Sequence, residues 1–477
     1  MTQDIEAADS SKEMEEKKKK EYPREKKKEE WEEKKKEEEC KPFYFPYNVP
    51  VSRSSATTIE RFSPSLQRFG NCSIICTPNL EATPLAVAIG PYHHGSPQFQ
   101  EMEQVKRTTM EEFCRGASQQ CEAVREKVLS LVAPARSCYA GERQLRHLKD
   151  GDFAEMMFLD GWFLLQFMVS MCPDDPDASP EADLLMSKAE VHTRIDDIAR
   201  DLLLLENQVP WPVIEALMEL WPAVPVDRFL SLMASVFNVG NKDIGDNSTA
   251  ELLLARNHDK DQLPTPPHLL GLFYRRQVGM ARTQSLRVPR LSSLSSTAVE
   301  LAEMGVKLTA SKTKMFGDMS MSKRRPGLSL SGELSLAPVV LNNLTACWLI
   351  NMAAYEACLG ATQADNFAVS SYISVLALLM NRKEDTQELR AKGIINSAFC
   401  DKATLGFFKA LAPHLHVGHR YYQVFQQLQE YRQERWVWIA VHRFLYKNIK
   451  TIIAVLSVIG VLTGLFKTIL SVKQHQQ

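Results

Sequence analysis

The ten residues Asp201-Leu202-Leu203-Leu204-Leu205-Glu206-Asn207-Gln208-Val209-Pro210 carry an apolar helical pattern directly into a break. The helix predicted over residues 196 to 205 ends here, because Pro210 and Pro212 lack the main-chain donor that a helix needs. A helical pattern resumes from residue 213 to 220. This succession of helix, break and helix, with few strand-like alternations, predicts a mainly α fold: a large helical body with a few short strands.

Glu206, Asn207 and Gln208 stand where a broken helix leaves main-chain groups without partners. Their side chains can bond those groups as caps, which is the usual role of polar clusters at helix breaks. Alternatively, the three side chains bind a ligand. We favour the structural interpretation.

Residues 152 to 168 are apolar on nearly all sides. A membrane span at this place would bring Glu155 and Asp160 into the bilayer, at a cost of ~2.5–3.5 kcal/mol for an acid at its centre. The sequence therefore predicts a buried core helix.

The most distinctive short string is Gly90-Pro91-Tyr92-His93-His94-Gly95. Its glycines permit left-handed backbone and its proline fixes φ, which is typical of a tight loop. The two histidines could act in acid–base catalysis, but no serine or cysteine lies in a recognisable nucleophile setting. A packed loop whose tyrosine and histidines bond main-chain groups is the favoured interpretation, and a catalytic role is the alternative.

The end of the sequence predicts a transmembrane helix within residues 447 to 477. Thr451 to Phe466 carries no charge, and the 24 residues from Ile449 to Val472 exceed the ~20 needed to cross a hydrocarbon core. We expect bilayer contact through Thr451–Val472 and insertion after synthesis; a buried or interfacial helix is the alternative. Gly460 and Gly464 have the GxxxG spacing of a possible homodimer face.

The amino-acid composition narrows the possible classes of protein function. The 477 residues carry 57 basic and 58 acidic side chains, so a nucleic-acid partner is not expected. Residues 12 to 39 hold interleaved lysines and glutamates that cannot enter a core, which predicts a disordered charged tail. The ten cysteines lack C-x-x-C spacing and are interpreted as reduced thiols. Without a signal-peptide core, a cytosolic body at the plasma membrane is expected.

No cofactor or metal is expected, because the phosphate-loop, serine-elbow and zinc-helix motifs are absent from the sequence. The best metal candidate is the histidine run His414-x-His416-x-x-His419, which has no acid or cysteine nearby to complete a ligand shell. We interpret these histidines as solvent-facing.

Several strings, in order along the chain, together resemble the plant family known as domain of unknown function 247. They are residues 89–95 with Met102-Glu103 and Lys106, then 160–165, 201–210, 301–306, 355–358 and 389–395. The resemblance covers about residues 60 to 472. It implies a plant-specific protein with a C-terminal transmembrane segment and no established enzymatic activity. Some grass members are associated with self-incompatibility, and others with growth or defence.

The resemblance and the composition shifts divide the chain into five predicted segments. These are a charged tail (1–42), an N-terminal helical half (43–276), a mobile serine-rich and basic insert ordered only near 299–308 (277–335), a C-terminal helical half (336–446), and the anchor with a short tail (447–477).

The sequence thus predicts a membrane-anchored, non-enzymatic protein of recognition or signalling, with an unknown protein partner. One alternative is an enzyme with an unrecognised site around His93, His94 and residues 206–208. The other is a soluble helical adaptor.

Overall fold

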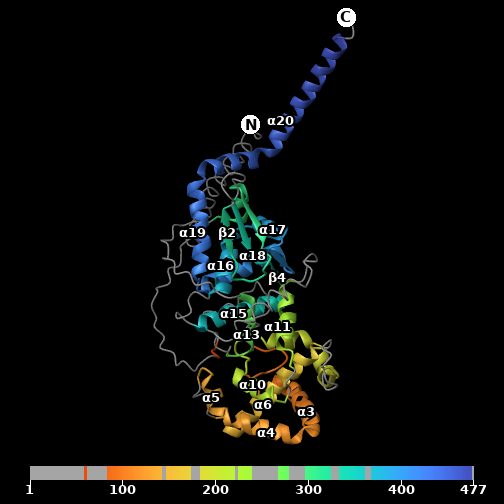
Figure 1. Cartoon of the computed structure of the whole chain (residues 1–477), viewed down its shortest axis with the longest axis vertical. Helices are drawn as coiled ribbons and strands as arrows, with labels where there is room; N and C mark the ends of the chain where they lie inside the picture. The colour runs from red at the N-terminus through yellow and green to blue at the C-terminus, as the bar shows by residue number, and fades with distance from the viewer. Residues whose placement is uncertain are drawn as a thin grey trace, which may run out of the picture. The chain divides into compact units, whose positions relative to one another are not determined.

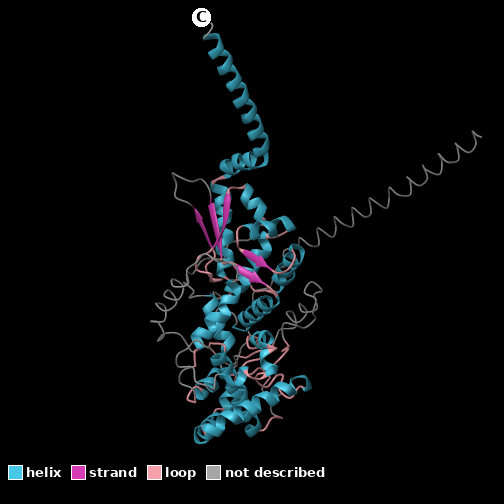
Figure 2. Cartoon of the chain, turned by 90° about the vertical axis from the view of Figure 1, so that its right-hand side faces the viewer, coloured by secondary structure: helices cyan, strands magenta, loops and turns pink. Residues whose placement is uncertain are grey.

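The structure is a computed structural model, and it describes most of the chain beyond the charged tail. The described residues are 59–61, 83–141, 145, 147–172, 183–220, 224–238, 267–278, 296–323, 332–359 and 367–474. Arg53–Gln477 forms one compact unit. The predicted tail of residues 1–42 lies outside the described residues. Helices dominate these residues and their five strands are short, so the predicted mainly α fold is confirmed (Figure 2).

Helix α6 (Asp150–Ser170) is the centre of the first helical group. A helix that is apolar on all sides is stable in water only when other elements surround it. Nearly every residue from Phe153 to Val169 is buried, which confirms the predicted core helix. The helices that pack against α6 include α3 (Gln100–Gly116), α4 (Ser118–Ser130), α5 (Val132–Ser137) and α10 (Trp211–Leu217), which lie beside it in Figure 1.

The chain between α6 and the sheet forms short helices. They are α7 (Asp183–Met186), α8 (Ala189–His192), α9 (Ile195–Asp201), α11 (Val226–Ser235), the 3-10 turn η5 (Val236–Asn238) and α13 (Leu269–Val278); a further 3-10 turn, η2 (Pro97–Phe99), precedes α3. Helix α9 ends at Asp201, four residues earlier than the sequence predicts, and residues 202–210 form a buried non-helical loop. Side chains replace the helix hydrogen bonds there, as described below.

A three-stranded sheet follows helix α14 (Ala298–Glu303). Its strands are β1 (Val306–Ala310), β2 (Ser320–Lys323) and β3 (Gly332–Leu336), in the order β1-β3-β2. The pairing of β1 with β3 is parallel, with Val306 opposite Gly332, and that of β2 with β3 is antiparallel. Within the predicted mobile insert over 277–335, the described residues 296–323 and 332–335 are more ordered than expected, because alternate residues of β1 and β3 are buried and join the core.

The C-terminal helical group begins with β4 (Val339–Leu341), which pairs in parallel with β5 (Ile395–Ser397). The group consists of α15 (Asn343–Leu359), α16 (Ala368–Leu379), α17 (Lys383–Ala391), α18 (Asp401–Leu411), η8 (Ala412–His414) and α19 (His419–Glu434). Helix α16 packs against four other elements of this group: α15, α18, η8 and α19. Apolar residues from both predicted halves, Phe153 and Trp348 among them, belong to one core cluster.

Helix α20 (Trp436–Gln474) differs from all of these. Among the described residues, α6 and α20 are the two helices long and apolar enough to cross a membrane. The most apolar window of α6 is mostly buried, whereas no residue of the most apolar window within Trp436–Lys467 of α20 is buried. At 1.5 Å per residue α20 is about 58 Å long, nearly twice the thickness of a hydrocarbon core.

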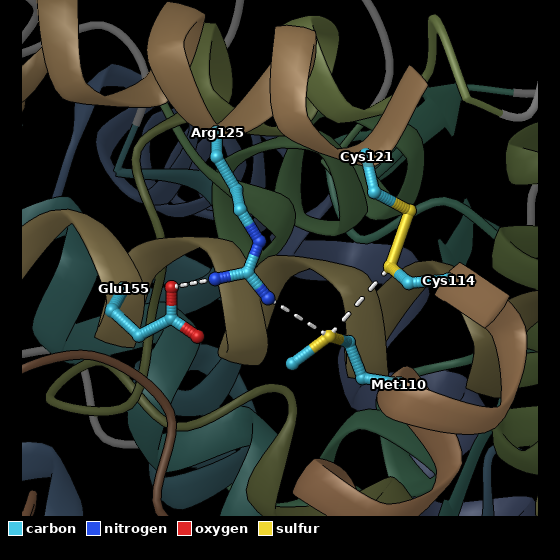
Figure 3. Close-up of a disulfide and its surroundings, with 5 residues drawn as sticks. All are labelled: Met110, Cys114, Cys121, Arg125 and Glu155. Carbon is cyan, nitrogen blue, oxygen red and sulfur yellow. Dashed lines mark hydrogen bonds and ion pairs between the residues drawn. A yellow bond between two sulfur atoms is a disulfide. The ribbon is translucent and has the colours of Figure 1, made fainter. Parts of the chain in front are cut away.

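Cys114 at the end of α3 and Cys121 in α4 form a disulfide (Figure 3). The expectation that all ten cysteines are reduced is wrong for this pair. A separation of seven residues does not resemble a short redox motif, and it becomes bridgeable only because the chain bends between the two helices. The other described cysteines, Cys138, Cys172, Cys347, Cys358 and Cys400, are not in disulfides.

Candidate functional site

The main chain of residues 85–90, buried from Ala86 onward, has no neighbouring strand, and side chains accept hydrogen bonds from five of its amides. Asp201 accepts hydrogen bonds from the amides of Leu85 (2.9 Å), Ala86 (2.6 Å) and Val87 (3.1 Å). A buried amide without a partner costs ~1–3 kcal/mol, so this single carboxylate is a large contribution to the segment's stability. Arg200 pairs with the same carboxylate at 2.6 Å.

Asn207 continues this pattern toward the glycine-rich string. Its Oδ1 accepts from the amide of Ile89 at 2.6 Å, and its Nδ2 donates to the carbonyl oxygens of Val87 (3.1 Å) and Asp201 (2.9 Å). One amide side chain thus takes the place of a neighbouring strand. It also connects residues 87–89 to the loop that follows α9.

Gln208 holds that loop in shape. Its Nε2 donates to the carbonyl oxygens of Leu202 (2.9 Å) and Leu204 (2.8 Å), which a longer α9 would have bonded internally. Its Oε1 accepts from the amide of Leu270 at 3.0 Å, near the start of α13. Both ends of this side chain are therefore used by main-chain groups.

Lys106 on α3 and Asp160 on α6 form a buried ion pair of 2.6 Å beneath the same segment. The ammonium also donates to the carbonyl oxygen of Ala88 and to Glu103, each at 2.5 Å, and Asp160 accepts from the amide of Gly90 at 2.8 Å. Burial lowers the pKa of Lys106, but the attraction of Asp160 and Glu103 outweighs it and leaves the pKa raised. The lysine is therefore charged at neutral pH.

We call this set, Lys106, Asp160, Asp201, Asn207 and Gln208, the buried polar network. Each of the five is at most 2 % exposed. Burial raises the pKa of Asp201 to about 6, against the lowering effects of Arg200 and of the amides of residues 85–87. The predicted site residues of two separate strings thus meet in one place, together with Asp160, whose role the sequence did not reveal.

The string after the network is folded as a tight loop. Gly90 has φ 77°, and a Cβ there would lie 2.5 Å from the carbonyl oxygen of Gln208. Tyr139 donates to that same oxygen at 2.8 Å and contacts the ring of Tyr92 edge-on. The Tyr92 hydroxyl lies 3.0 Å from the carbonyl oxygens of Ile59 and Ala140. Pro91 is buried, His94 is half-buried and Gly95 is exposed.

His93 and Glu206 come together at the edge of the network. Their Nε2 and Oε2 atoms are 4.0 Å apart, and the two side chains are 17 % and 9 % exposed. Burial, aided by Arg61, lowers the pKa of His93 to about 4, so the imidazole is neutral at pH 7. Arg61 itself lies over the ring of Tyr92. The strings of the predicted catalytic alternative are therefore neighbours.

The loop also joins the N-terminal helices to the C-terminal ones. The amide of Leu205 donates to Oδ1 of Asn351 in α15 at 2.8 Å, and Pro210 is the residue before the first turn of α10. Asn351 is a contact that the sequence did not predict. Its partner lies 146 residues away, and no local pattern marks such a pair.

A second buried polar cluster surrounds Glu356 in α15. Its carboxylate accepts from the amides of Val369 and Ser370 (2.8 Å each), from the Ser370 hydroxyl (2.6 Å) and from the Tyr274 hydroxyl (2.7 Å). Burial raises the pKa of Glu356 to about 7. The glutamate fixes the start of α16 against α13 and α15.

In the described part of the chain, no group of three His, Cys, Asp or Glu side chains is placed to hold a metal ion. His414 closes η8 and His416 contacts the ring of Phe367.

The fold and the network together define a mainly helical protein with a side-chain-bonded core segment and an exposed apolar helix at its C-terminal end. The chain matches, over residues 78–463, a family described as "Plant protein of unknown function", and it belongs to that family, domain of unknown function 247. It is 25% identical over 352 residues to a UPF0481 protein of Arabidopsis thaliana, covering 69% of this chain and 68% of the relative. No solved structure matches it.

Proposed function

We propose that this chain is a membrane-anchored, non-enzymatic protein of recognition or signalling, with its body in the cytosol at the plasma membrane. The observation that carries the proposal is the exposure of α20. Elsewhere in the described residues, the exposed large apolar side chains are those of Leu85, Leu129 and Leu232, whereas sixteen such side chains along α20, between Trp436 and Phe466, are 42–70% exposed. Apolar surface in water costs about 25 cal/mol per Å², so a helix of this kind requires a bilayer or a partner.

Two parts of α20 have different surroundings, which supports an anchor held close to the body. Its first turns contact α14 and α19. Glu303 pairs with Arg443 (3.6 Å) and Lys447 (3.4 Å), and its carbonyl oxygen lies 2.9 Å from Nδ1 of His442. Thr451–Val472 follows, 22 residues or about 33 Å of helix, which matches a hydrocarbon core of ~30 Å.

The buried polar network supports the non-enzymatic part of the proposal. The side chains of Asp201, Asn207 and Gln208 form hydrogen bonds with main-chain groups of the protein itself. The motif therefore has a structural explanation that needs no substrate. A membrane anchor and a motif with a structural role are consistent with signalling or recognition, and self-incompatibility, growth and defence are the processes to examine first.

The enzyme alternative rests on one observation, the approach of His93 to Glu206. A general base works best when its pKa is near the working pH. With a pKa of about 4, His93 is a weak base at pH 7. If the purified chain turned over a substrate, and His93→Gln abolished turnover while leaving the fold intact, the non-enzymatic proposal would fail.

Gly460 and Gly464 support a possible homodimer within the membrane. Both are exposed in α20, and a Cβ added at either would meet nothing within 4 Å. Two helices can therefore approach closely along this face. Crosslinking of the full chain in membranes, compared with Gly460→Leu and Gly464→Leu, tests the dimer: equal crosslinking in all three excludes this face.

Fractionation with protease protection tests the anchor and its orientation. The full chain should pellet with membranes, with its body digested by protease added on the cytosolic side, and a truncation ending at Lys450 should be soluble. Protection of the body, with glycans on the sequons at Asn71, Asn247 or Asn343, would reverse the proposed orientation. A soluble full chain would favour the adaptor.

A further inference from the structure

The corner between α3 and α4 is built around the Cys114–Cys121 disulfide. Helix α3 ends at Gly116 and α4 begins at Ser118, and Ala117 between them leaves the helical region with φ −131° and ψ 38°. The two cysteine Cα atoms are 5.9 Å apart. In an unbroken helix, residues seven apart are separated by about 10.5 Å, beyond the ~4.4–6.8 Å that a disulfide spans. The bond can therefore form only because the chain bends here.

Side chains one helical turn away from each cysteine also meet (Figure 3). The Met110 sulfur lies 3.8 Å from that of Cys114 and 3.2 Å from Nη2 of Arg125. Arg125 in turn pairs with Glu155 of α6 and lies over the ring of Phe158. These contacts do not depend on the sulfur–sulfur bond, so they can hold α4 on α6 after the disulfide is reduced.

The two sulfurs differ in access. Cys114 is half-buried, whereas Cys121 is 3 % exposed and belongs to the core cluster. A reagent in solution reaches the first sulfur more readily than the second. This is the arrangement of an attacking thiol and a resolving thiol.

We propose that Cys114 and Cys121 form a reversible oxidation site that fixes the α3–α4 corner when oxidised and loosens it when reduced. The oxidant is a low-molecular-weight disulfide such as oxidised glutathione. The Cys114 thiolate attacks one glutathione sulfur, releases one glutathione thiol and leaves a mixed disulfide. The Cys121 thiolate then attacks the Cys114 sulfur and releases the second. Two protein thiols lose two electrons and two protons, and one small disulfide becomes two thiols.

Loosening at this corner reaches the site described above through α3. Lys106 lies two turns before Cys114 in that helix, and its ammonium holds Asp160 and the carbonyl oxygen of Ala88. Both α3 and α4 pack on α6, which carries Asp160. Reduction therefore acts at the outer end of the helix that positions the ion pair.

Peptide-resolved mass spectrometry of the full chain in detergent tests the chemistry. Oxidised glutathione should convert the reduced chain to the Cys114–Cys121 disulfide, and dithiothreitol should reverse it. Cys121→Ser should retain one glutathione on Cys114, whereas Cys114→Ser should leave Cys121 unmodified. Free thiols at both positions after oxidation, or glutathione on Cys121 in the second variant, would overturn the proposed site.

Hydrogen exchange tests the corner itself. The amide of Cys121 donates to the carbonyl oxygen of Ala117 across the bend. In the reduced wild-type chain, amides of residues 117–121 should exchange at least about tenfold faster than in the oxidised chain, while those of α6 keep their protection. Cys114→Ser should show the fast rate under both conditions, and Cys400→Ser, at an exposed free thiol, should behave as wild type. Equal exchange rates in the oxidised and reduced wild-type chain would overturn the proposal that the disulfide fixes this corner.

Discussion

Gly90 illustrates how tightly single residues are constrained around the buried polar network. Its φ of 77° lies in the left-handed region, and Gln208 main chain stands where a Cβ would be. The string that contains it is easily singled out in the sequence. What the glycine faces is visible only in the fold, because Gln208 is more than a hundred residues away.

We predict that Gly90→Ala lowers the free energy of unfolding by about 2–4 kcal/mol, from backbone strain and the clash together. Gly95→Ala is the matched control, since its φ is 75° but a Cβ there would meet nothing within 4 Å. That change should cost only about 1–2 kcal/mol. Chemical unfolding followed by tryptophan fluorescence measures both, and equal losses would contradict the clash.

Glu356 makes a pH prediction with a defined sign. Its folded pKa of about 7 lies above the ordinary value of 4.5, so folding favours the protonated form. The stability gained from this preference is fully present below about pH 4.5 and is lost as pH rises through 7. Glu356→Gln removes the titration. The stability of wild type relative to this variant should fall by about 3 kcal/mol between pH 4.5 and 8.

Unfolding of the wild type and of Glu356→Gln across this pH range checks the prediction. A difference that stays constant with pH would show that Glu356 keeps an ordinary pKa in the folded chain.

Among the elements, those that depend on local pattern were predictable. Helix α6 is apolar on nearly all sides and α20 carries a long uncharged run, so both follow from the sequence. The sequence did not predict the three-stranded sheet, because β1 and β2 are each held by pairing with β3, which comes later in the chain. Pairing over such distances leaves no mark within any one strand.

The candidate site divides in the same way. Gly90, Lys106, Asp201, Asn207 and Gln208 stand in distinctive strings and were singled out. Their partners were not: Asp160 meets Gly90 across 70 residues, and Asn351 meets Leu205 across 146. The sequence also did not predict the early end of α9. The side chain of Gln208 forms the hydrogen bonds that a longer helix would have made, and these bonds are visible only in the folded chain.

The packing of α20 against α14 gives a prediction about how these two helices are held together. Gly305 has φ 79°, and a Cβ there would lie 3.3 Å from His442 and Trp438 of α20. Gly305→Ala should therefore loosen the first turns of α20, with faster hydrogen exchange over residues 436–442. Gly393→Ala, whose φ is 66° and whose Cβ would meet nothing within 4 Å, should leave these amides unchanged. Unchanged exchange in both variants would contradict the docking.

For the molecule as a whole, the described body shares one hydrophobic core, and α20 carries apolar surface that this core does not cover. The account therefore depends on a bilayer around Thr451–Val472. Within that segment, Val458 and Leu462 are 59% exposed each and one helical turn apart.

The most direct measurement is carbonate extraction of membranes carrying the full chain with Val458→Arg and Leu462→Arg. Each charge at the bilayer centre costs ~2.5–3.5 kcal/mol, so we predict that this variant is released while wild type stays in the pellet. Leu129→Arg with Leu232→Arg, at exposed leucines outside α20, is the matched control and should stay with the membranes. Release of wild type, or retention of the α20 variant, would contradict the membrane anchor.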